Sequence, residues 1–282
     1  MAIQWYPGHM AKARREVSEA LKQVDIIYEI VDARIPESSR NPLLDEIGQG
    51  KKRLIILNKA DLADPAATRA WIDYYAAHQL PAIAIDAQHT KGINQIAQAT
   101  RAELAEYVAK QKDRGVRQVL LRAMCIGIPN VGKSTILNRL AQRNIAQAGN
   151  TPGVTRAQQW IKTNADIMLL DTPGILWPKF EDPLVGTKLA LTGAIKDTLF
   201  HPDDVALFAL KQLSHQAQDQ LTKFYHVTPA ELQLAGPDLL MQMTAHLGFR
   251  DDYERTSWAI INDVRKGRLG RFTWDEVPAD GQ

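Results

Sequence analysis

The chain has 282 residues, with 34 lysines and arginines, 32 aspartates and glutamates, and one cysteine. This length predicts one large domain and a smaller second one. The net charge of +2 excludes a uniformly basic protein that coats nucleic acid, and the single Cys125 excludes a disulfide framework or a cysteine-based metal site. No apolar run is long enough to span a bilayer, and we expect a cytoplasmic protein.

The first half of the chain alternates predicted helices and strands. Helices are expected over residues 10–24, in a short stretch after Pro42, from Pro65 (capped by Asp64) to Ala77, and over 93–112. Strands are expected over residues 25–31, 53–57, 82–85 and 119–126. This alternation predicts an α/β fold with a mostly parallel sheet, in which ligands bind at the carboxyl ends of the strands.

A phosphate-binding motif follows the fourth of these strands. Gly127 to Ser134 fits the P-loop pattern G-x-x-x-x-G-K-S, and a helix is expected from Thr135. In such a loop the backbone N–H groups surround the phosphates, while Lys133 reaches the β- and γ-phosphates and Ser134 binds Mg²⁺. The predicted nucleotide contacts of this loop are Asn130, Val131, Gly132, Lys133, Ser134 and Thr135.

The strand over 53–57 ends in Asn58-Lys59-Ala60-Asp61, which predicts that the base is guanine. The Asp61 carboxylate can accept hydrogen bonds from N1–H and the 2-amino group of guanine, whereas adenine offers no matching pair of donors. Lys59 would lie over the base, and Asn58 would tie neighbouring loops together. Asp86 and Ala87, after the next strand, are candidates for contact with the edge of the base.

Two short strands are expected over 158–163 and 167–170, the second ending in Asp171-Thr172-Pro173-Gly174. The Asp171 carboxylate can hold Mg²⁺ through water, and the Gly174 N–H can bond the γ-phosphate. Thr155 is the candidate for a second hydroxyl on the ion, with Thr151 as the alternative. The next residue, Ile175, has no hydrogen-bonding side-chain atom and cannot orient an attacking water.

The rest of the chain is predicted to be helical, with a capping box at Thr228 to Glu231 and a helix over 251–265. A boundary near Pro202 divides the chain into expected domains 1–202 and 203–282. The second domain is not basic overall, but it carries one basic patch, made of Arg265, Lys266, Arg268 and Arg271. This patch is either an RNA contact or a solvated helix end, and the alternative RNA surface is made of Arg114, Arg117, Arg139 and Arg143.

The motifs stand in an unusual order, because N-K-x-D and Asp86-Ala87 precede the P-loop instead of following it. In this order the sequence resembles the circularly permuted GTPases and, within them, the ribosome biogenesis GTPase A (RbgA/YlqF) family. The resemblance covers nearly the whole chain and is most specific up to Asp182. The residues that carry it are Trp5 to Ala13, Asp32 to Pro36, Asn58 to Asp61, Gly127 to Thr135, and Asp171 to Asp182.

This resemblance implies a permuted P-loop GTPase domain of three layers, followed by an all-α domain that contacts ribosomal RNA. It also implies a cytoplasmic, Mg²⁺-dependent GTPase that acts in late maturation of the large ribosomal subunit, with turnover stimulated by the ribosome. We expect a monomer. The Pro-Gly-His motif of the family points to His9 as the group that positions water, with packing or RNA contact as its alternative. Asn130 resembles the asparagine that helps to bind K⁺ in potassium-activated GTPases, with bracing of the loop as its alternative.

Two other classes of protein remain open on the sequence. A P-loop ATPase or nucleotide kinase is disfavoured by Asp61, and a comparison of GTP and ATP binding separates this class from a GTPase. A GTP-sensing RNA-binding module without turnover is disfavoured by Lys133, Ser134 and Asp171. Multiple turnover with and without ribosomal subunits distinguishes that module from an enzyme.

Overall fold

The computed structural model describes residues 7–142, 159–163, 166–171 and 182–279. The described residues form two compact units, one made of residues 182–272 and one that combines the described residues between 7 and 171 with residues 273–279. We call the first the helical unit and the second the sheet unit. None of the helices in the described ranges is long and apolar enough to cross a membrane.

The limits of these units differ from the domain boundary expected near residue 202. The helical unit starts earlier because α7 (Pro183–Thr192) packs against α8 (Pro202–Gln216) and α11 (Tyr253–Arg265). It also ends earlier, because the chain returns to the sheet unit after Phe272. The helical unit is therefore inserted into the sheet unit and is not a C-terminal addition to it.

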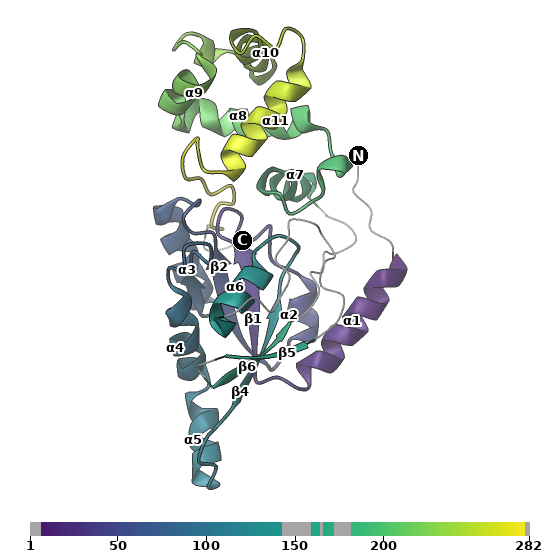
Figure 1. Ribbon diagram of the computed structural model, residues 1–282, viewed down its shortest axis with the longest axis vertical. Helices are drawn as coiled ribbons and strands as arrows, with labels where there is room; N and C mark the ends of the chain where they lie inside the picture. Colours follow the sequence, from purple (N-terminus) through teal and green to yellow (C-terminus); the bar gives the residue numbers. More distant parts are fainter. Residues whose placement is uncertain (1–6, 143–158, 164–165, 172–181, 280–282) are drawn as a thin grey trace. The chain divides into compact units, whose positions relative to one another are not determined.

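A six-stranded sheet forms the centre of the sheet unit, in the order β3-β2-β1-β4-β6-β5 (Figure 1). Its strands are β1 (Ile26–Asp32), β2 (Lys52–Asn58), β3 (Ala82–Ala84), β4 (Leu121–Ile126), β5 (Gln159–Lys162) and β6 (Ile167–Asp171). All neighbours are parallel except β5, which pairs antiparallel with β6. The predicted mostly parallel α/β sheet is confirmed.

Helices cover both faces of this sheet. Ile27 of β1 lies in a buried cluster with apolar residues of α1, whereas the next residue, Tyr28, hydrogen-bonds Thr100 of α4 with 2.6 Å between the hydroxyls. Consecutive residues of a strand point to opposite faces, so α1 and α4 lie on opposite sides and the unit has three layers. The helices are α1 (Pro7–Leu21), α2 (Leu43–Ile47), α3 (Pro65–Ala77), α4 (Ile93–Glu103), α5 (Ala105–Asp113) and α6 (Lys133–Ala141).

The helical unit contains α7, α8 and α11 together with α9 (Gln218–Tyr225), α10 (Gly236–His246) and two short 3₁₀ turns, η1 (Asp197–Leu199) and η2 (Glu231–Gln233). The predicted capping box is present at η2. The Thr228 N–H and hydroxyl donate to Glu231 Oε2 at 2.7 and 2.8 Å, and the Glu231 N–H donates back to the Thr228 hydroxyl at 3.3 Å. This pair of residues thus satisfies two backbone N–H groups at the start of the turn.

Local sequence signals placed most of the elements to within a few residues. Asp64 caps α3 by accepting from the Ala67 N–H at 2.7 Å, with Pro65 at the first helical position as expected. The single helix expected over 93–112 is wrong, because the chain breaks at Leu104 into α4 and α5. Helix α1 begins at Pro7 instead of residue 10, so His9 lies in its first turn.

Candidate nucleotide-binding site

The P-loop lies between β4 and α6, as the sequence predicts. Gly132 has φ of +100°, and a Cβ added there would collide with the side-chain amide of Asn58. A Cβ on Gly127 would likewise collide with the Ile30 carbonyl of the neighbouring strand β1. Both glycines are therefore required by close approach of the backbone, and at Gly132 also by its conformation.

Lys133 is the buried cation of this loop. Its Nζ donates to the carbonyls of Gly127 and Ile128 at 3.0 and 2.7 Å, so the ammonium is held inside the curve of the loop. Burial lowers the pKa of Lys133 to about 8, against the opposing effect of the Asp171 carboxylate at the end of β6. A buried ammonium that donates to backbone carbonyls is well suited to an incoming phosphate.

Asn58 joins three of the predicted motifs. Its Nδ2 donates to the Val131 carbonyl of the P-loop at 2.7 Å, and its Oδ1 accepts from the Ala87 N–H at 3.1 Å. The Asn58 side chain is buried, so both bonds are protected from water. The end of β2, the P-loop and the loop after β3 therefore meet at one place, although they are far apart in sequence.

Lys59 is directed by a carboxylate that the sequence reasoning gave no role. Its Nζ lies 2.9 Å from Asp32 Oδ2, and Asp32 is also bound by the Arg34 guanidinium, whose Nε and Nη2 donate at 2.9 and 2.7 Å. Burial acts to raise the pKa of Asp32, but Arg34 and Lys59 outweigh it and hold the pKa below its ordinary value. Asp32 thus stays ionised and fixes the direction of Lys59.

The loop after β3 is shaped by two groups that the sequence did not reveal. Asp86 accepts from the His89 N–H at 3.0 Å and lies 2.7 Å from His89 Nδ1, which is in turn 4.0 Å from the Asp61 carboxylate. Arg139 of α6 donates to the carbonyls of Ala87 and Gln88 at 3.1 and 2.8 Å. Arg139 therefore braces the candidate base-edge loop, and its guanidinium is already bonded.

The proposed magnesium ligands are divided between described and undescribed residues. Ser134 lies at the start of α6, and Asp171 ends β6 in register with Cys125 of β4, so both lie at the same edge of the sheet as the P-loop. Gly174, Thr151 and Thr155 lie outside the described residues. The side chain of His9 is also outside the described part of the chain, whereas Asn130 lies in the P-loop with φ of +62°.

Comparisons with known proteins identify the family of this chain. Residues 122–233 match the protein family described as 50S ribosome-binding GTPase. Ribosome biogenesis GTPase A of Priestia megaterium is 48% identical, over 98% of this chain and 97% of its own length. The chain belongs to the ribosome biogenesis GTPase A family. Mitochondrial ribosome-associated GTPase 1 of Mus musculus is more distant, at 32% identity over 98% of this chain and 91% of its own.

Solved structures show that the fold of this ribosome biogenesis GTPase A family member is the expected permuted one. GDP-bound YlqF superimposes with a TM-score of 0.66 at 21% identity, covering 93% of this chain and 99% of that chain. GNP-bound YlqF from T. maritima gives a TM-score of 0.64 at 21% identity, covering 94% of this chain and 98% of that chain. At this identity the likeness concerns the fold alone.

The basic patch at residues 265–271 is partly used inside the helical unit. Arg265 donates to the Ala190 carbonyl at 2.7 Å and to the Leu191 carbonyl at 3.2 Å, and it pairs with Asp197 at 2.8 Å. Arg268 pairs with Asp263 at 3.0 Å. Arg265 therefore has a structural role, which the sequence pattern of clustered cations did not distinguish from a surface role.

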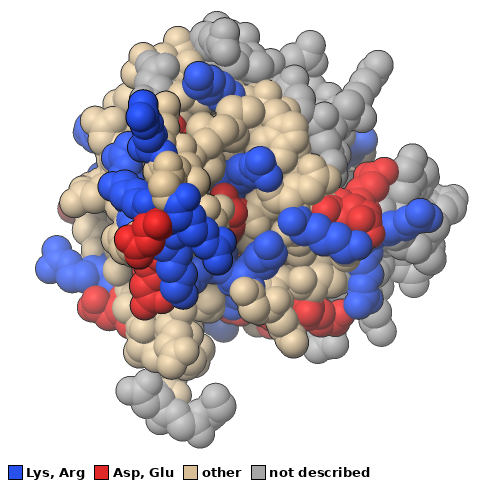
Figure 2. Space-filling view, turned by 90° about the horizontal axis from the view of Figure 1, so that it is seen from below, with Lys and Arg blue, Asp and Glu red and all other residues tan. Residues whose placement is uncertain are grey.

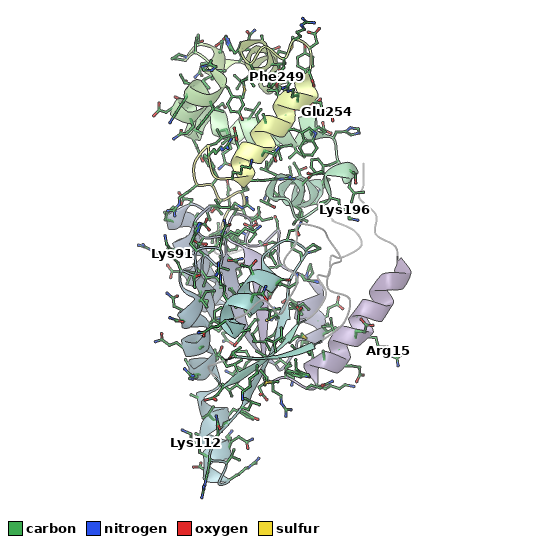
Figure 3. All side chains as sticks on the ribbon, viewed as in Figure 1. Arg15, Lys91, Lys112, Lys196, Phe249 and Glu254 are labelled. Atoms are coloured by element: carbon green, nitrogen blue, oxygen red, sulfur yellow. The ribbon has the colours of Figure 1, made fainter. Side chains whose placement is uncertain are left out.

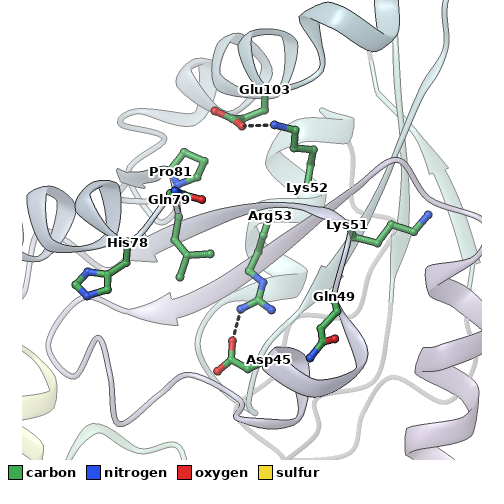
Figure 4. A pocket seen from close by; sticks show the side chains of 10 residues that line it. Asp45, Gln49, Lys51, Lys52, Arg53, His78, Gln79, Pro81 and Glu103 are labelled. Carbon is green, nitrogen blue, oxygen red and sulfur yellow. Dashed lines mark hydrogen bonds and ion pairs between the residues drawn. The ribbon is translucent and has the colours of Figure 1, made fainter.

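A polar pocket at the other edge of the sheet is distinct from this site (Figure 4). It is lined by Lys51, Lys52 and Arg53 at the start of β2, whereas Asn58 lies at the end of that strand. Two of its three Lys and Arg side chains are paired with acidic residues, since Arg53 lies 2.6 Å from Asp45 and Lys52 lies 3.7 Å from Glu103, whereas Lys51 donates to the Val24 carbonyl at 2.7 Å. This internal pairing offsets most of the positive charge of the pocket.

Proposed function

We propose that this chain is an Mg²⁺-dependent GTPase that assists late maturation of the large ribosomal subunit and that the ribosome stimulates. Its relatives are named ribosome biogenesis GTPase A in bacilli and mitochondrial ribosome-associated GTPase 1 in the mouse. The observation that carries the proposal is the Asn58 side chain, which bonds both Val131 and Ala87. One amide thereby joins the phosphate loop to the loop proposed to contact guanine.

The proposed site would hold the nucleotide in position and neutralise the charge of its phosphates. Backbone N–H groups of residues 130–135 and Lys133 would bind the phosphates, Asp61 would accept from guanine, and the Gly174 N–H would bond the γ-phosphate. The Ser134 hydroxyl and the Asp171 carboxylate are hard oxygen ligands that suit Mg²⁺, and Thr155 or Thr151 would add a third. The ion, when bound, neutralises charge on the β- and γ-phosphates.

The main test measures GTP hydrolysis with and without large ribosomal subunits. We expect slow turnover alone, multiple turnovers that subunits accelerate, and no comparable binding of ATP. Lys133→Ala is the control for the site and should abolish hydrolysis. Guanine-nucleotide binding without any turnover, even with subunits present, would favour the alternative of a GTP-sensing RNA-binding module.

The water-positioning group is proposed to be His9, in the first turn of α1. A neutral imidazole can accept a hydrogen bond from water, which Ile175 cannot. His9→Ala should lose subunit-stimulated turnover by roughly ten-fold or more while GTP affinity is unchanged. Full activity, or a loss explained by weaker subunit binding alone, would assign His9 to packing or RNA contact.

A monovalent cation is proposed beside the phosphates, with Asn130 among its ligands. Such an ion would neutralise charge as the bond to the γ-phosphate breaks, as an arginine finger does. Hydrolysis should therefore be faster in potassium than in sodium at equal ionic strength. Equal rates in the two salts would leave Asn130 as an amide that braces the loop.

Ribosomal RNA is proposed as the partner, and two basic surfaces are candidates for the contact. Lys266, Arg268 and Arg271 form the first, since Arg265 is engaged internally. Helix α5 and the loop after it form the second surface. None of the residues of α5 is buried. Its candidate cations are Lys112, Arg114 and Arg117, which have no ion pair within the described part of the chain. Figure 3 labels Lys112 on this helix. Figure 2 views the molecule from the side on which α5 lies in Figure 1, and Lys and Arg side chains are spread over this face.

Salt dependence separates these two surfaces. Charge removal at the true contact should weaken subunit binding and flatten its dependence on salt, because fewer counterions are released from the RNA on binding when phosphate contacts are lost. The matched variants are Lys266→Gln with Arg268→Gln and Arg271→Gln, and Lys112→Gln with Arg114→Gln and Arg117→Gln. An unchanged salt slope in both triple variants would place the RNA contact elsewhere.

A further inference from the structure

The segment that follows the helical unit binds the loop after β1. This loop comprises residues 33–39, and most of it is buried. The Asp275 carboxylate accepts from the Glu37 N–H at 2.9 Å, from the Ser38 N–H at 2.7 Å and from the Ser38 hydroxyl at 2.7 Å. Asp275 is only 6% exposed, and these three donors contribute to stabilising its negative charge.

Backbone and indole bonds hold the same segment on both sides of Asp275. The Trp274 N–H donates to the Arg34 carbonyl at 2.7 Å, and the Trp71 Nε1–H of α3 donates to the Asp275 carbonyl at 3.4 Å. Val277 packs against the apolar cluster that contains Trp71. We call residues 273–277 the tail strap.

The loop held by the tail strap in turn positions the guanine motif. The Ala33 N–H donates to the Asn58 carbonyl at 2.8 Å, directly before Lys59 in the chain. Arg34 binds Asp32, and Asp32 binds Lys59 at 2.9 Å. The contacts therefore form a continuous series from Asp275 through the loop to the residue proposed to lie over the base.

We infer that Asp275 is a positioning residue for guanine-nucleotide binding. By fixing residues 37 and 38, the tail strap keeps the loop in the conformation in which Asp32 directs Lys59. The strap follows α11 of the helical unit in sequence, so withdrawal of the strap by a partner of that unit would weaken nucleotide binding. Because such coupling is reciprocal, bound nucleotide would equally strengthen the docking of the strap.

This inference rests on the proposed guanine site, and Asp275→Asn tests it. The substitution keeps the size of the side chain and removes its charge, and Glu276→Gln is the matched control because Glu276 is its exposed neighbour. We expect the affinities for GDP and GTP to fall together by about five-fold or more, since the base motif does not contact the γ-phosphate. The maximal hydrolysis rate at saturating GTP should be unchanged.

A second variant and a reciprocal measurement separate positioning from a general loss of structure. Ser38→Ala removes one donor to Asp275, and its effect on GDP affinity should be less than additive with that of Asp275→Asn. Bound GDP should slow hydrogen exchange of the Glu37 and Ser38 amides in the unmodified chain but not in Asp275→Asn.

Three results would overturn the inference. The first is unchanged nucleotide affinity in a cooperatively folded Asp275→Asn variant. The second is an equal loss in Glu276→Gln, and the third is a lower maximal rate at unchanged affinity. If Asp275→Asn does not fold, Ser38→Ala decides by the same readouts. Absence of guanine-nucleotide binding in the unmodified chain would instead refute the proposed function and, with it, this inference.

Discussion

The buried ammonium of Lys133 predicts how the stability of the nucleotide-free protein depends on pH. Burial lowers its pKa from 10.5 to about 8, whereas in the unfolded chain the pKa keeps its ordinary value. Between these two values the unfolded chain binds more protons than the folded chain, so the free energy of unfolding should rise with pH. One pKa unit is worth about 1.4 kcal/mol, so the gain across this window is about 3 kcal/mol.

Nucleotide affinity should have the opposite dependence on pH. Phosphates beside Lys133 favour its charged form and raise its pKa, so nucleotide binding takes up protons once the pH is near 8. At pH 8 about half of the Lys133 side chains are neutral in the nucleotide-free protein, and about half a proton should be taken up per GDP. Affinity should therefore fall as the pH rises further.

Both effects can be measured on the intact chain, with Lys133→Met as the control. Urea unfolding at pH 8 and at about 9.5 should show a stability gain of about 2 kcal/mol that the variant lacks. Calorimetry of GDP binding in two buffers with different heats of ionisation gives the proton uptake at pH 8. An equal stability gain in Lys133→Met, or no proton uptake at pH 8, would refute the reasoning.

Four further substitutions test other contacts. Asn58→Ala leaves the buried Val131 carbonyl and the Ala87 N–H without their shared partner, so the free energy of unfolding should fall by about 2 kcal/mol or more. Urea denaturation measures this change, and a decrease below about 0.5 kcal/mol would contradict the bridging role of Asn58. Asp61→Asn should shift base preference from guanine towards xanthine, because an amide offers a donor where xanthine has a carbonyl, and unchanged GTP affinity would remove Asp61 from the base site. Arg265→Ala should destabilise the helical unit by about 1–3 kcal/mol, because two backbone carbonyls lose their donor. Arg268→Ala, which removes an exposed guanidinium from its pair with Asp263, should change stability by less than about 1 kcal/mol. Equal effects in denaturation would refute this distinction.

Structural features that depend on residues close together in the chain could be predicted from the sequence. The P-loop between β4 and α6 could be predicted, because an apolar run precedes its glycines and a helical pattern follows them. The parallel order of the strands then brought the ends of β1, β2, β3, β4 and β6 to one edge of the sheet, where the predicted nucleotide residues lie. Asp64 and Pro65 placed the start of α3 correctly because a cap and its proline act within one turn.

Contacts between residues far apart in the chain could not be predicted from the sequence. Arg139 was read as a surface cation because it lies on an exposed helical position, yet it bonds two carbonyls of another loop. Asp275 gave no signal, because its partners Glu37 and Ser38 lie near the other end of the chain. The break between α4 and α5 at Leu104 could not be predicted, because no glycine or proline, the usual signals of a helix end, stands there.

In the part of the chain that the structure describes, the polypeptide passes from the sheet unit to the helical unit between Asp171 and Asp182 and returns to the sheet unit after Phe272. A proteolytic cut in one of these crossings would leave the two units covalently attached through the other. A domain that hangs from a single linker can swivel about it, but two anchor points restrict such rotation. A force on the helical unit would therefore reach the sheet unit through both crossings, one that follows Asp171 in sequence and one next to Trp274, whose N–H donates to the Arg34 carbonyl.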